Sequence, residues 1–158
     1  MIYGEKTNAA RLLDAHNIPY ELIPYDAGEV ELGAVHVAEQ IGEPIERVFK
    51  TLVLRGDKNG CFVCVVPGDK EVDLKLAAKV SGNKSCSLIP VKDLLGLTGY
   101  IRGGCSPIGM KKHFPTYIHD TCRQFPFIYV SAGMRGLQLR IAPDDLVRAA
   151  EAEVCVLF

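Results

Sequence analysis

Hydrophobic and polar positions follow two different periods along the chain, which predicts a domain with both helices and strands. Apolar residues three and four positions apart are typical of amphipathic helices, and short apolar or alternating runs between turn residues are typical of strands. Helices are predicted at residues 8–17, 34–41, 73–80, 91–95 and 143–150, with another helical turn from Pro44. Strands are predicted at 20–23, 48–54, 61–66, 116–119, 127–131, 137–141 and 154–157, and one more is expected to start at 100–101.

The order of these elements predicts the fold class. Strands outnumber helices, and the turn sequence at 56–60 is typical of a hairpin rather than of a crossover connection. We therefore expect an α+β (mixed α/β) domain with a central mixed, mostly antiparallel sheet surrounded by helices. The length of 158 residues, 48% of them hydrophobic, suits a single domain over residues 1–158 that buries its own core.

Composition and charge restrict the functions that this domain can have. A net charge of -1 excludes a strongly basic protein that coats nucleic acid through its whole surface, but it is compatible with a local basic patch. No apolar run approaches the ~18 residues that span a bilayer, and the N-terminus lacks the apolar stretch of a signal peptide. We expect a cytoplasmic protein with no membrane partner, in which most of the six cysteines are small buried hydrophobic residues.

Lys50 is an unusual residue in its surroundings, because its strand is apolar on both faces. One face carries Val48, Lys50, Leu52 and Leu54, and the other carries Phe49, Thr51 and Val53. Such a strand belongs in the middle of a sheet, where a buried ammonium costs several kcal/mol unless an anion or carbonyl meets it. Two interpretations stay open: the amine reaches water at the strand end, or it lines a polar pocket for an anionic or carbonyl ligand.

Two glycine-rich segments follow predicted strands and provide candidate backbone donors. Residues 102–112 contain paired glycines flanked by basic residues, and residues 131–136 contain small residues and Arg135. Paired glycines let backbone N–H groups approach a ligand oxygen closely, so these segments could border one pocket and stabilise an oxyanion. The alternative is two plain turns with solvated basic residues.

Other motifs give little support for metal or covalent chemistry. Cys61 and Cys64 form a C-x-x-C sequence, but alternation along a strand would place the two thiols on opposite faces. The histidines share no ligand spacing, although His119 and Asp120 could form an orienting pair at a strand end. No Gly-x-Ser-x-Gly sequence is present. We therefore expect no metal site.

Three motifs together resemble the YbaK type of aminoacyl-tRNA deacylase. They are Phe49-Lys50-Thr51-Leu52-Val53, then Thr98-Gly99-Tyr100 with the segment 103–112, and then Tyr129-Val130-Ser131-Ala132-Gly133-Met134-Arg135-Gly136-Leu137. The resemblance covers nearly the whole chain. It implies the fold of the prolyl-tRNA synthetase editing domain, with a partly closed, barrel-like sheet. The implied activity is trans-editing of mischarged Cys-tRNA(Pro) without a metal or organic cofactor, in which the substrate's own thiol attacks its ester carbonyl.

The same resemblance assigns roles to residues of this chain. Catalytic roles fall on Lys50, Gly103 and Gly104, and substrate contacts on Tyr25, Ser131 and Gln138. Basic residues expected to hold the CCA end of the tRNA are Arg102, Lys111, Lys112 and Arg135. A small patch of this kind suggests that prolyl-tRNA synthetase holds the rest of the tRNA in a ternary complex.

Two departures from the family pattern leave the substrate open. Gln138 stands where some relatives carry a pocket aspartate, and residues 28–34 lack an aromatic residue that some relatives have there. Within the same class, deacylation of alanyl-, seryl- or threonyl-tRNA by an activated water is an alternative. A non-catalytic regulator that binds a nucleotide or small ligand is a second alternative, and a thiol-redox protein a third.

Overall fold

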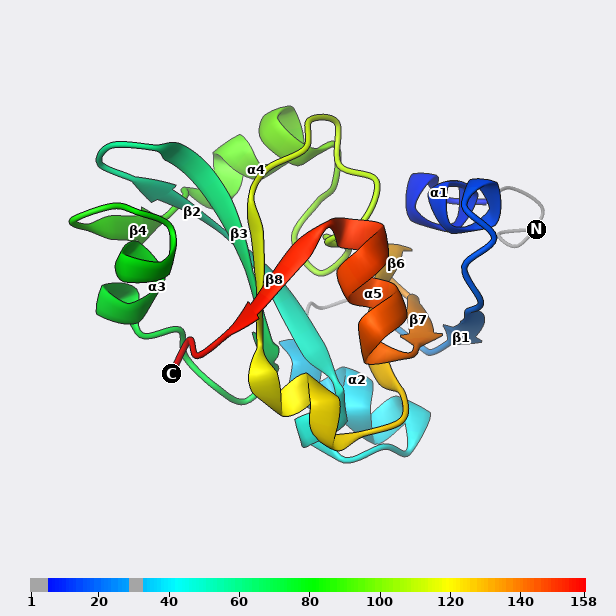
Figure 1. Cartoon of the computed structure of the whole chain (residues 1–158). Coiled ribbons are helices and arrows are strands. Elements are labelled where there is room, and N and C mark those ends of the chain that lie inside the picture. The colour runs from blue at the N-terminus through cyan, green and yellow to red at the C-terminus, as the bar shows by residue number, and fades with distance from the viewer. Residues whose placement is uncertain (1–5, 29–32) are drawn as a thin grey trace.

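The computed structural model describes residues 6–28 and 33–158, in which helices surround two β-sheets (Figure 1). The helices are α1 (Asn8–Ala15), α2 (Gly33–Ile41), α3 (Leu74–Val80), α4 (Val91–Thr98) and α5 (Pro143–Ala150), with 3-10 turns at Ile45–Arg47 and Asp120–Gln124. The strands are β1 (Glu21–Pro24), β2 (Phe49–Gly56), β3 (Gly60–Pro67), β4 (Cys86–Leu88), β5 (Thr116–His119), β6 (Ile128–Met134), β7 (Leu137–Ile141) and β8 (Ala152–Cys155).

The strands form a three-stranded sheet in the order β1-β7-β6 and a five-stranded sheet in the order β4-β2-β3-β5-β8. Neighbouring strands are antiparallel except for β3 with β5 and β5 with β8, which are parallel. The predicted α+β class, with mixed and mostly antiparallel pairing, is therefore confirmed.

The expected barrel-like closure is wrong, because the two sheets stay separate. Closing a barrel needs continuous strand pairing around the whole circumference. Here β2 pairs with β4 only through residues 54–56. Among the described residues, an isolated parallel bridge joins Val48, just before β2, to Tyr129 of the other sheet. One edge of β2 is thus without a strand partner between these two points.

The core confirms that β2 lies inside its sheet with both faces covered. Phe49 and Val53 pack in the main hydrophobic cluster, and Leu54 packs in a second cluster on the opposite face. The same separation applies to the C-x-x-C sequence: Cys61 packs against the first cluster and Cys64 belongs to the second. The two thiols therefore lie on opposite faces of β3, as the alternation predicts.

Two strand predictions differ from the structure. Tyr100 and Ile101 form no strand, because this stretch is held in a turn in which the Tyr100 hydroxyl donates to the Ile108 carbonyl at 2.7 Å. Strand β4 was not predicted, since its three residues carry no alternating pattern and form an edge next to the hairpin. No helix of the described residues is both long and apolar enough to cross a membrane.

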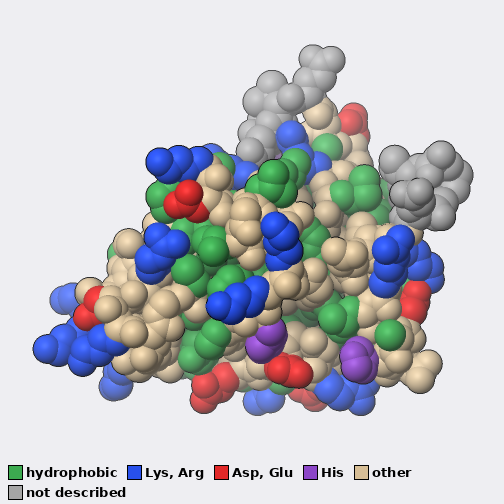
Figure 2. All heavy atoms as spheres, turned by 90° about the horizontal axis from the view of Figure 1, so that it is seen from above, with side chains coloured by type: hydrophobic (Ala, Val, Ile, Leu, Met, Phe, Trp, Pro, Cys, Tyr) green, Lys and Arg blue, Asp and Glu red, His purple; other side chains and the backbone are tan. Residues whose placement is uncertain are grey.

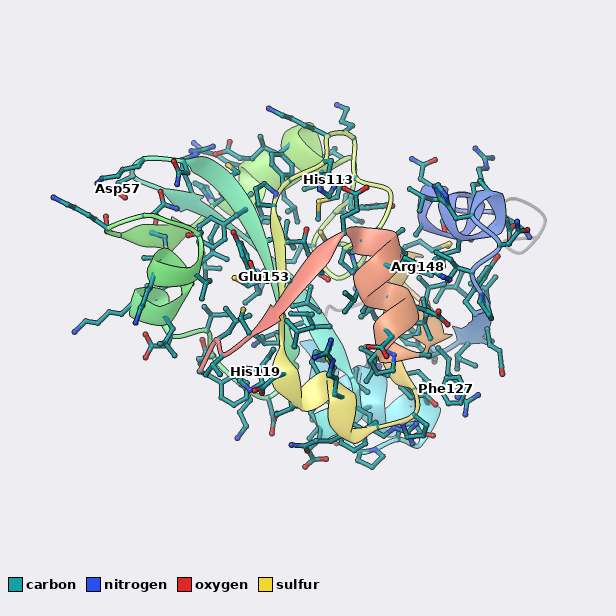
Figure 3. All side chains as sticks on the ribbon, viewed as in Figure 1. Asp57, His113, His119, Phe127, Arg148 and Glu153 are labelled. Carbon is teal, nitrogen blue, oxygen red and sulfur yellow. The ribbon has the colours of Figure 1, made fainter. Side chains whose placement is uncertain are left out.

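His119 fixes the C-terminal segment against the end of β5 (Figure 3). Its Nδ1 accepts the Leu157 N–H at 3.0 Å, and its ring stacks on Phe158 with 3.8 Å between the ring centroids. Because Nδ1 accepts, the proton of the neutral ring is on Nε2, which lies 3.3 Å from the Asp120 carboxylate. Burial lowers the pKa of His119, and the Asp120 charge opposes that shift.

The stability of the protein should therefore decrease in mild acid. A histidine whose pKa is lowered by folding contributes its full stability above the ordinary value of 6.5, and this contribution is lost as the pH falls through the lowered pKa. We expect the free energy of unfolding, measured by urea denaturation from about pH 8 to pH 5, to fall less steeply in His119→Asn than in the unmodified protein. Equal slopes in the two proteins would contradict this assignment.

Candidate active site

A pocket of about 310 Å³ opens beside the edge of β2 that faces the three-stranded sheet. Strand β2 supplies residues 49–52, and Val48 precedes it. Strands β6 and β7 supply one residue each, and the remainder come from α2, the segment 102–105 and the segments that follow β1 and β6. The lining residues are Tyr25, Ala27, Gly33, Ala34, His36, Val37, Val48, Phe49, Lys50, Thr51, Leu52, Arg102, Gly103, Cys105, Ser131, Arg135 and Gln138. The gap that prevents barrel closure is thus also the site of the pocket.

Lys50 lines this pocket on the second residue of β2, opposite Val66 of β3. Its side chain is partly buried, and no described residue forms a hydrogen bond or ion pair with its ammonium. Of the two interpretations left open by the sequence, the geometry favours a lysine that lines a polar pocket. An ammonium in this position attracts an anionic or carbonyl oxygen from a ligand.

The charge of the pocket is positive although the chain as a whole has a net charge of -1. Lys50, Arg102 and Arg135 line it, and none of the described lining residues is Asp or Glu. Because like charges raise the local potential in a recess, this arrangement favours a substrate that carries phosphate or develops negative charge during reaction.

Residues of both glycine-rich segments line the pocket, which is the first of the two interpretations of the sequence, and the segments are also in direct contact. A methyl group added at Gly104 would lie 3.1 Å from the backbone of Met134 and Arg135, and one added at Gly103 would lie 3.4 Å from the Arg135 side chain. Gly103 also has a φ of +84°, which glycine adopts without strain. Because Gly103 and Gly104 carry no side chains, the 102–105 segment can approach the end of β6 closely.

Gly103 and Gly104 differ in what their backbone can offer a ligand. The Gly104 N–H donates to the Ile101 carbonyl at 2.9 Å, and Gly104 is not among the lining residues. Gly103 lines the pocket, and none of the backbone bonds found in the turns of the described residues uses its N–H. Of the two glycines predicted as catalytic, Gly103 can present a donor, whereas Gly104 allows close packing.

The predicted substrate-binding residues Tyr25, Ser131 and Gln138 all line the pocket. Ser131 and Gln138 are cross-strand partners on β6 and β7, and the Tyr25 N–H donates to the Gly136 carbonyl at 2.9 Å. Gln138 is only 5% exposed, and its Oε1 atom has no hydrogen-bond partner. A buried unpaired carbonyl costs free energy, so a ligand donor would stabilise it.

Sequence reasoning missed other pocket residues, of which three carry chemistry. The Thr51 hydroxyl is buried without a hydrogen-bond partner, and the His36 Nε2 lies 3.0 Å from the Asp26 carbonyl. Cys105 is buried, and burial raises the pKa of its thiol to about 12. Of these three, only Thr51 could have been predicted from the sequence, because it is a polar residue next to Lys50 on an otherwise apolar strand. The residues at 29–32, where some relatives have an aromatic residue, lie outside the described residues.

The predicted tRNA-binding residues divide between two places. Arg102 and Arg135 line the pocket, whereas Lys111 and Lys112 line a separate hollow of about 420 Å³ with Cys61, Gly96, Leu97 and Phe114. The four residues therefore do not form one patch around the mouth of the pocket. Within the described part of the chain, no group of three His, Cys, Asp or Glu residues could hold a metal ion.

Comparison with known proteins identifies the family. The aminoacyl-tRNA editing domain matches residues 32–149, which include most of the pocket. The chain belongs to this family. It is therefore an aminoacyl-tRNA deacylase, an editing enzyme of translation, and the resemblance to the YbaK type is confirmed. A non-catalytic regulator has no comparable support.

Relatives extend the comparison over nearly the whole chain. The chain is 50% identical over 143 residues to the Enterococcus faecalis protein named "Putative Cys-tRNA(Pro)/Cys-tRNA(Cys) deacylase EbsC", covering 90% of this chain and 87% of that protein. It is 32% identical over 78 residues to a proline–tRNA ligase of Fervidobacterium nodosum, covering 49% of this chain and 13% of the ligase. A crystal structure described as "a putative trans-editing enzyme for prolyl tRNA synthetase" has the same fold, with a TM-score of 0.81 at 23% identity over 97% of this chain and 98% of that one.

The contact between the glycine segments can be tested with Gly104→Ala. The added methyl group meets backbone atoms at 3.1 Å, so it should push the 102–105 segment outward and lower deacylation about 10- to 100-fold. The matched control is Gly60→Ala, where φ is +74° and the methyl group enters open space, so that only stability is lost. The measurements are the deacylation rate and the thermal unfolding of both variants. Unchanged activity in Gly104→Ala would show that close contact between the 102–105 segment and the end of β6 is not needed for deacylation.

Proposed function

We propose that this enzyme removes cysteine from mischarged Cys-tRNA(Pro), and that the substrate's own thiol is the nucleophile. The observation that carries the proposal is a cationic pocket whose described residues include no activated nucleophile. The relative named for Cys-tRNA(Pro) and Cys-tRNA(Cys) supports the choice of substrate, since it shares half of its residues with this chain over most of both lengths.

The side chains of the pocket support this mechanism because none of them is prepared to attack an ester. The Cys105 thiol, with a pKa of about 12, stays protonated near neutral pH. The Ser131 hydroxyl accepts the Gly133 N–H at 3.1 Å, and no described hydrogen bond joins it to a histidine. A serine or cysteine nucleophile needs an adjacent base or a lowered pKa, and the described contacts of Ser131 and Cys105 provide neither.

The proposed reaction balances without any further reactant. The cysteinyl sulfur forms a bond to the ester carbonyl carbon, and the bond between that carbon and the ribose oxygen breaks. The thiol proton is transferred to the departing ribose oxygen, so that the products are free tRNA and a cyclic thiolactone. The enzyme then contributes mainly by positioning the thiol and by stabilising negative charge on the carbonyl oxygen.

Residue roles follow from the position of each group in the pocket. The Lys50 ammonium and the Gly103 N–H stabilise the developing oxyanion or the terminal phosphate. The Gln138 Oε1 and the Thr51 hydroxyl, both unpaired and buried, form hydrogen bonds with the aminoacyl group, which Ser131 also borders.

The end of the tRNA occupies the mouth of the same pocket. Tyr25 borders the terminal adenosine, and Arg102 and Arg135 contact the CCA phosphates. A net charge of -1 is unsuited to a large phosphate footprint, so prolyl-tRNA synthetase holds the rest of the tRNA in a ternary complex. The match to a segment of proline–tRNA ligases supports this partner, because it relates the chain to ligases for the same tRNA.

A water-based route is the alternative, and His36 is the observation that favours it. His36 lines the pocket, and a neutral imidazole can act as a general base toward water. Such a route would serve alanyl-, seryl- or threonyl-tRNA, whose amino acids carry no thiol.

Lys50→Met should separate catalysis from stability. Removing the ammonium removes charge stabilisation, so deacylation of Cys-tRNA(Pro) should fall about 100-fold or more. Stability should stay the same or increase, because no described residue pairs with Lys50 and its strand is packed on both faces. Lys58→Met at the exposed hairpin tip is the matched control for loss of one charge. Activity in Lys50→Met close to that of the control would refute the role of this residue.

Blocking the substrate thiol distinguishes the two routes. We expect tRNA(Pro) charged with S-methylcysteine to be stable in the presence of the enzyme, because the methylated sulfur has no proton to lose and cannot close the ring. The measurement is the rate of loss of radiolabelled aminoacyl ester, compared with that for cysteine and alanine. Deacylation of the S-methylated or alanyl ester at a rate near that of the cysteinyl ester would favour attack by water.

A further inference from the structure

The second hollow has features that the editing pocket does not explain. It lies beside α4, and its lining combines an apolar floor with two lysines at the rim. The floor consists of Cys61, Leu97 and Phe114. Gly96 of α4 also lines the hollow and adds no side chain there. A hollow of about 420 Å³ with cations at its edge suits a ligand that carries both anionic groups and flat or apolar surfaces.

The lysines of the hollow are not neutralised by carboxylates. No Asp or Glu lines the hollow in the described part of the chain, and none of the ion pairs found there includes Lys111 or Lys112. The Lys111 ammonium lies 3.5 Å from the Gly96 carbonyl, and the Lys112 ammonium lies 5.8 Å from the centre of the Phe114 ring. Both charges are therefore available to an external anion.

Figure 2 shows the face of the molecule that lies uppermost in Figure 1, where α4 is found. Lys and Arg side chains lie among hydrophobic side chains across the middle of this face, and most Asp and Glu side chains lie near its margins. The positive charge is thus local, as required for a polyanion that binds a chain of net charge -1.

The hollow and the editing pocket are connected by one firmly held segment. Arg102, Gly103 and Cys105 border the pocket, and Lys111 and Lys112 border the hollow. Between them, residues 104–108 are buried, the Ile108 carbonyl accepts the Tyr100 hydroxyl, and the Lys111 N–H donates to the Thr98 carbonyl at 2.9 Å. Lys111 lies nine positions after Arg102, so their Cα atoms lie at most about 30 Å apart. A single polyanionic ligand can therefore span both places.

We infer that this hollow binds the sugar–phosphate backbone of the tRNA acceptor stem, beyond the terminal nucleotides that enter the editing pocket. The inference rests on the proposed function, and it assigns Lys111 and Lys112 to a second contact instead of the pocket mouth. The lysines neutralise phosphates, and the apolar floor packs against sugar and base surfaces. The enzyme thereby holds its substrate at two points that the 102–112 segment keeps at a fixed separation.

The test compares substrates that do and do not reach the hollow. We expect Lys111→Ala/Lys112→Ala to weaken binding of an uncharged acceptor-stem RNA hairpin, measured by fluorescence anisotropy at several salt concentrations. The slope of log affinity against log salt concentration should decrease by about 1 for each lysine removed. Deacylation of a cysteinylated CCA trinucleotide, which is too short to reach the hollow, should be unchanged.

Two further variants control for charge and for folding. Lys75→Ala/Lys79→Ala on α3 removes the same charge from exposed positions elsewhere and should leave hairpin binding unchanged. Lys111→Arg/Lys112→Arg keeps the charge and should restore binding.

Two results would overturn the inference. One is that the unmodified protein and Lys111→Ala/Lys112→Ala bind the hairpin with the same affinity and the same salt dependence. The hollow would then not be an RNA-binding site, and a protein partner would be the remaining candidate. The other is an equal loss with the CCA trinucleotide, which would place both lysines at the pocket. Hairpin binding does not require turnover, so it tests this site even if cysteinyl esters prove not to be the substrate.

Discussion

The candidate site depends on one constraint: the ammonium of Lys50 is carried by a strand that is packed on both faces. The described residues of the pocket give Lys50 no carboxylate, and two arginines line the same recess. Such a group is stable only where it keeps contact with solvent or meets an anionic ligand. The protein therefore carries a charge for which the described pocket residues supply no counter-charge, and in the proposed reaction a substrate oxygen would provide that partner.

The separation of the two sheets makes room for that charge. If β2 paired along its full length with the three-stranded sheet, the recess beside residues 48–52 would be filled by strand and side chains. Instead, β6 contains a bulge between Ser131 and Met134, where its pairing with β7 shifts register. A bulge bends a strand and increases its twist. The end of β6 then meets the 102–105 segment, whose glycines allow the close contact. The sheet topology and the geometry of the pocket thus have one structural origin.

The sequence predicted the parts of this site that depend on local pattern. Lys50 stood out because its strand neighbours are apolar, and the two glycine segments because paired glycines follow strands. The different backbone environments of Gly103 and Gly104 could not be predicted, since the bond from Gly104 to Ile101 depends on a turn that the pattern suggested was a strand. The separation of Lys111 from Arg102 was also hidden, because adjacency in sequence does not reveal how the segment between them folds back over Tyr100.

The distribution of charge is consistent with an enzyme that must release tRNA quickly. A chain of net charge -1 gains no long-range attraction for a polyanion, so in the proposed mode of binding its affinity for tRNA would arise from the few cations at the pocket and the hollow. Editing requires contact with the aminoacyl end of a tRNA that must afterwards return to a synthetase. Tight binding of substrate and transition state alike would slow this exchange without increasing the rate of the chemical step. If the ester reacts in the pocket as proposed, the concentrated charge there would act on the transition state, where it accelerates the reaction.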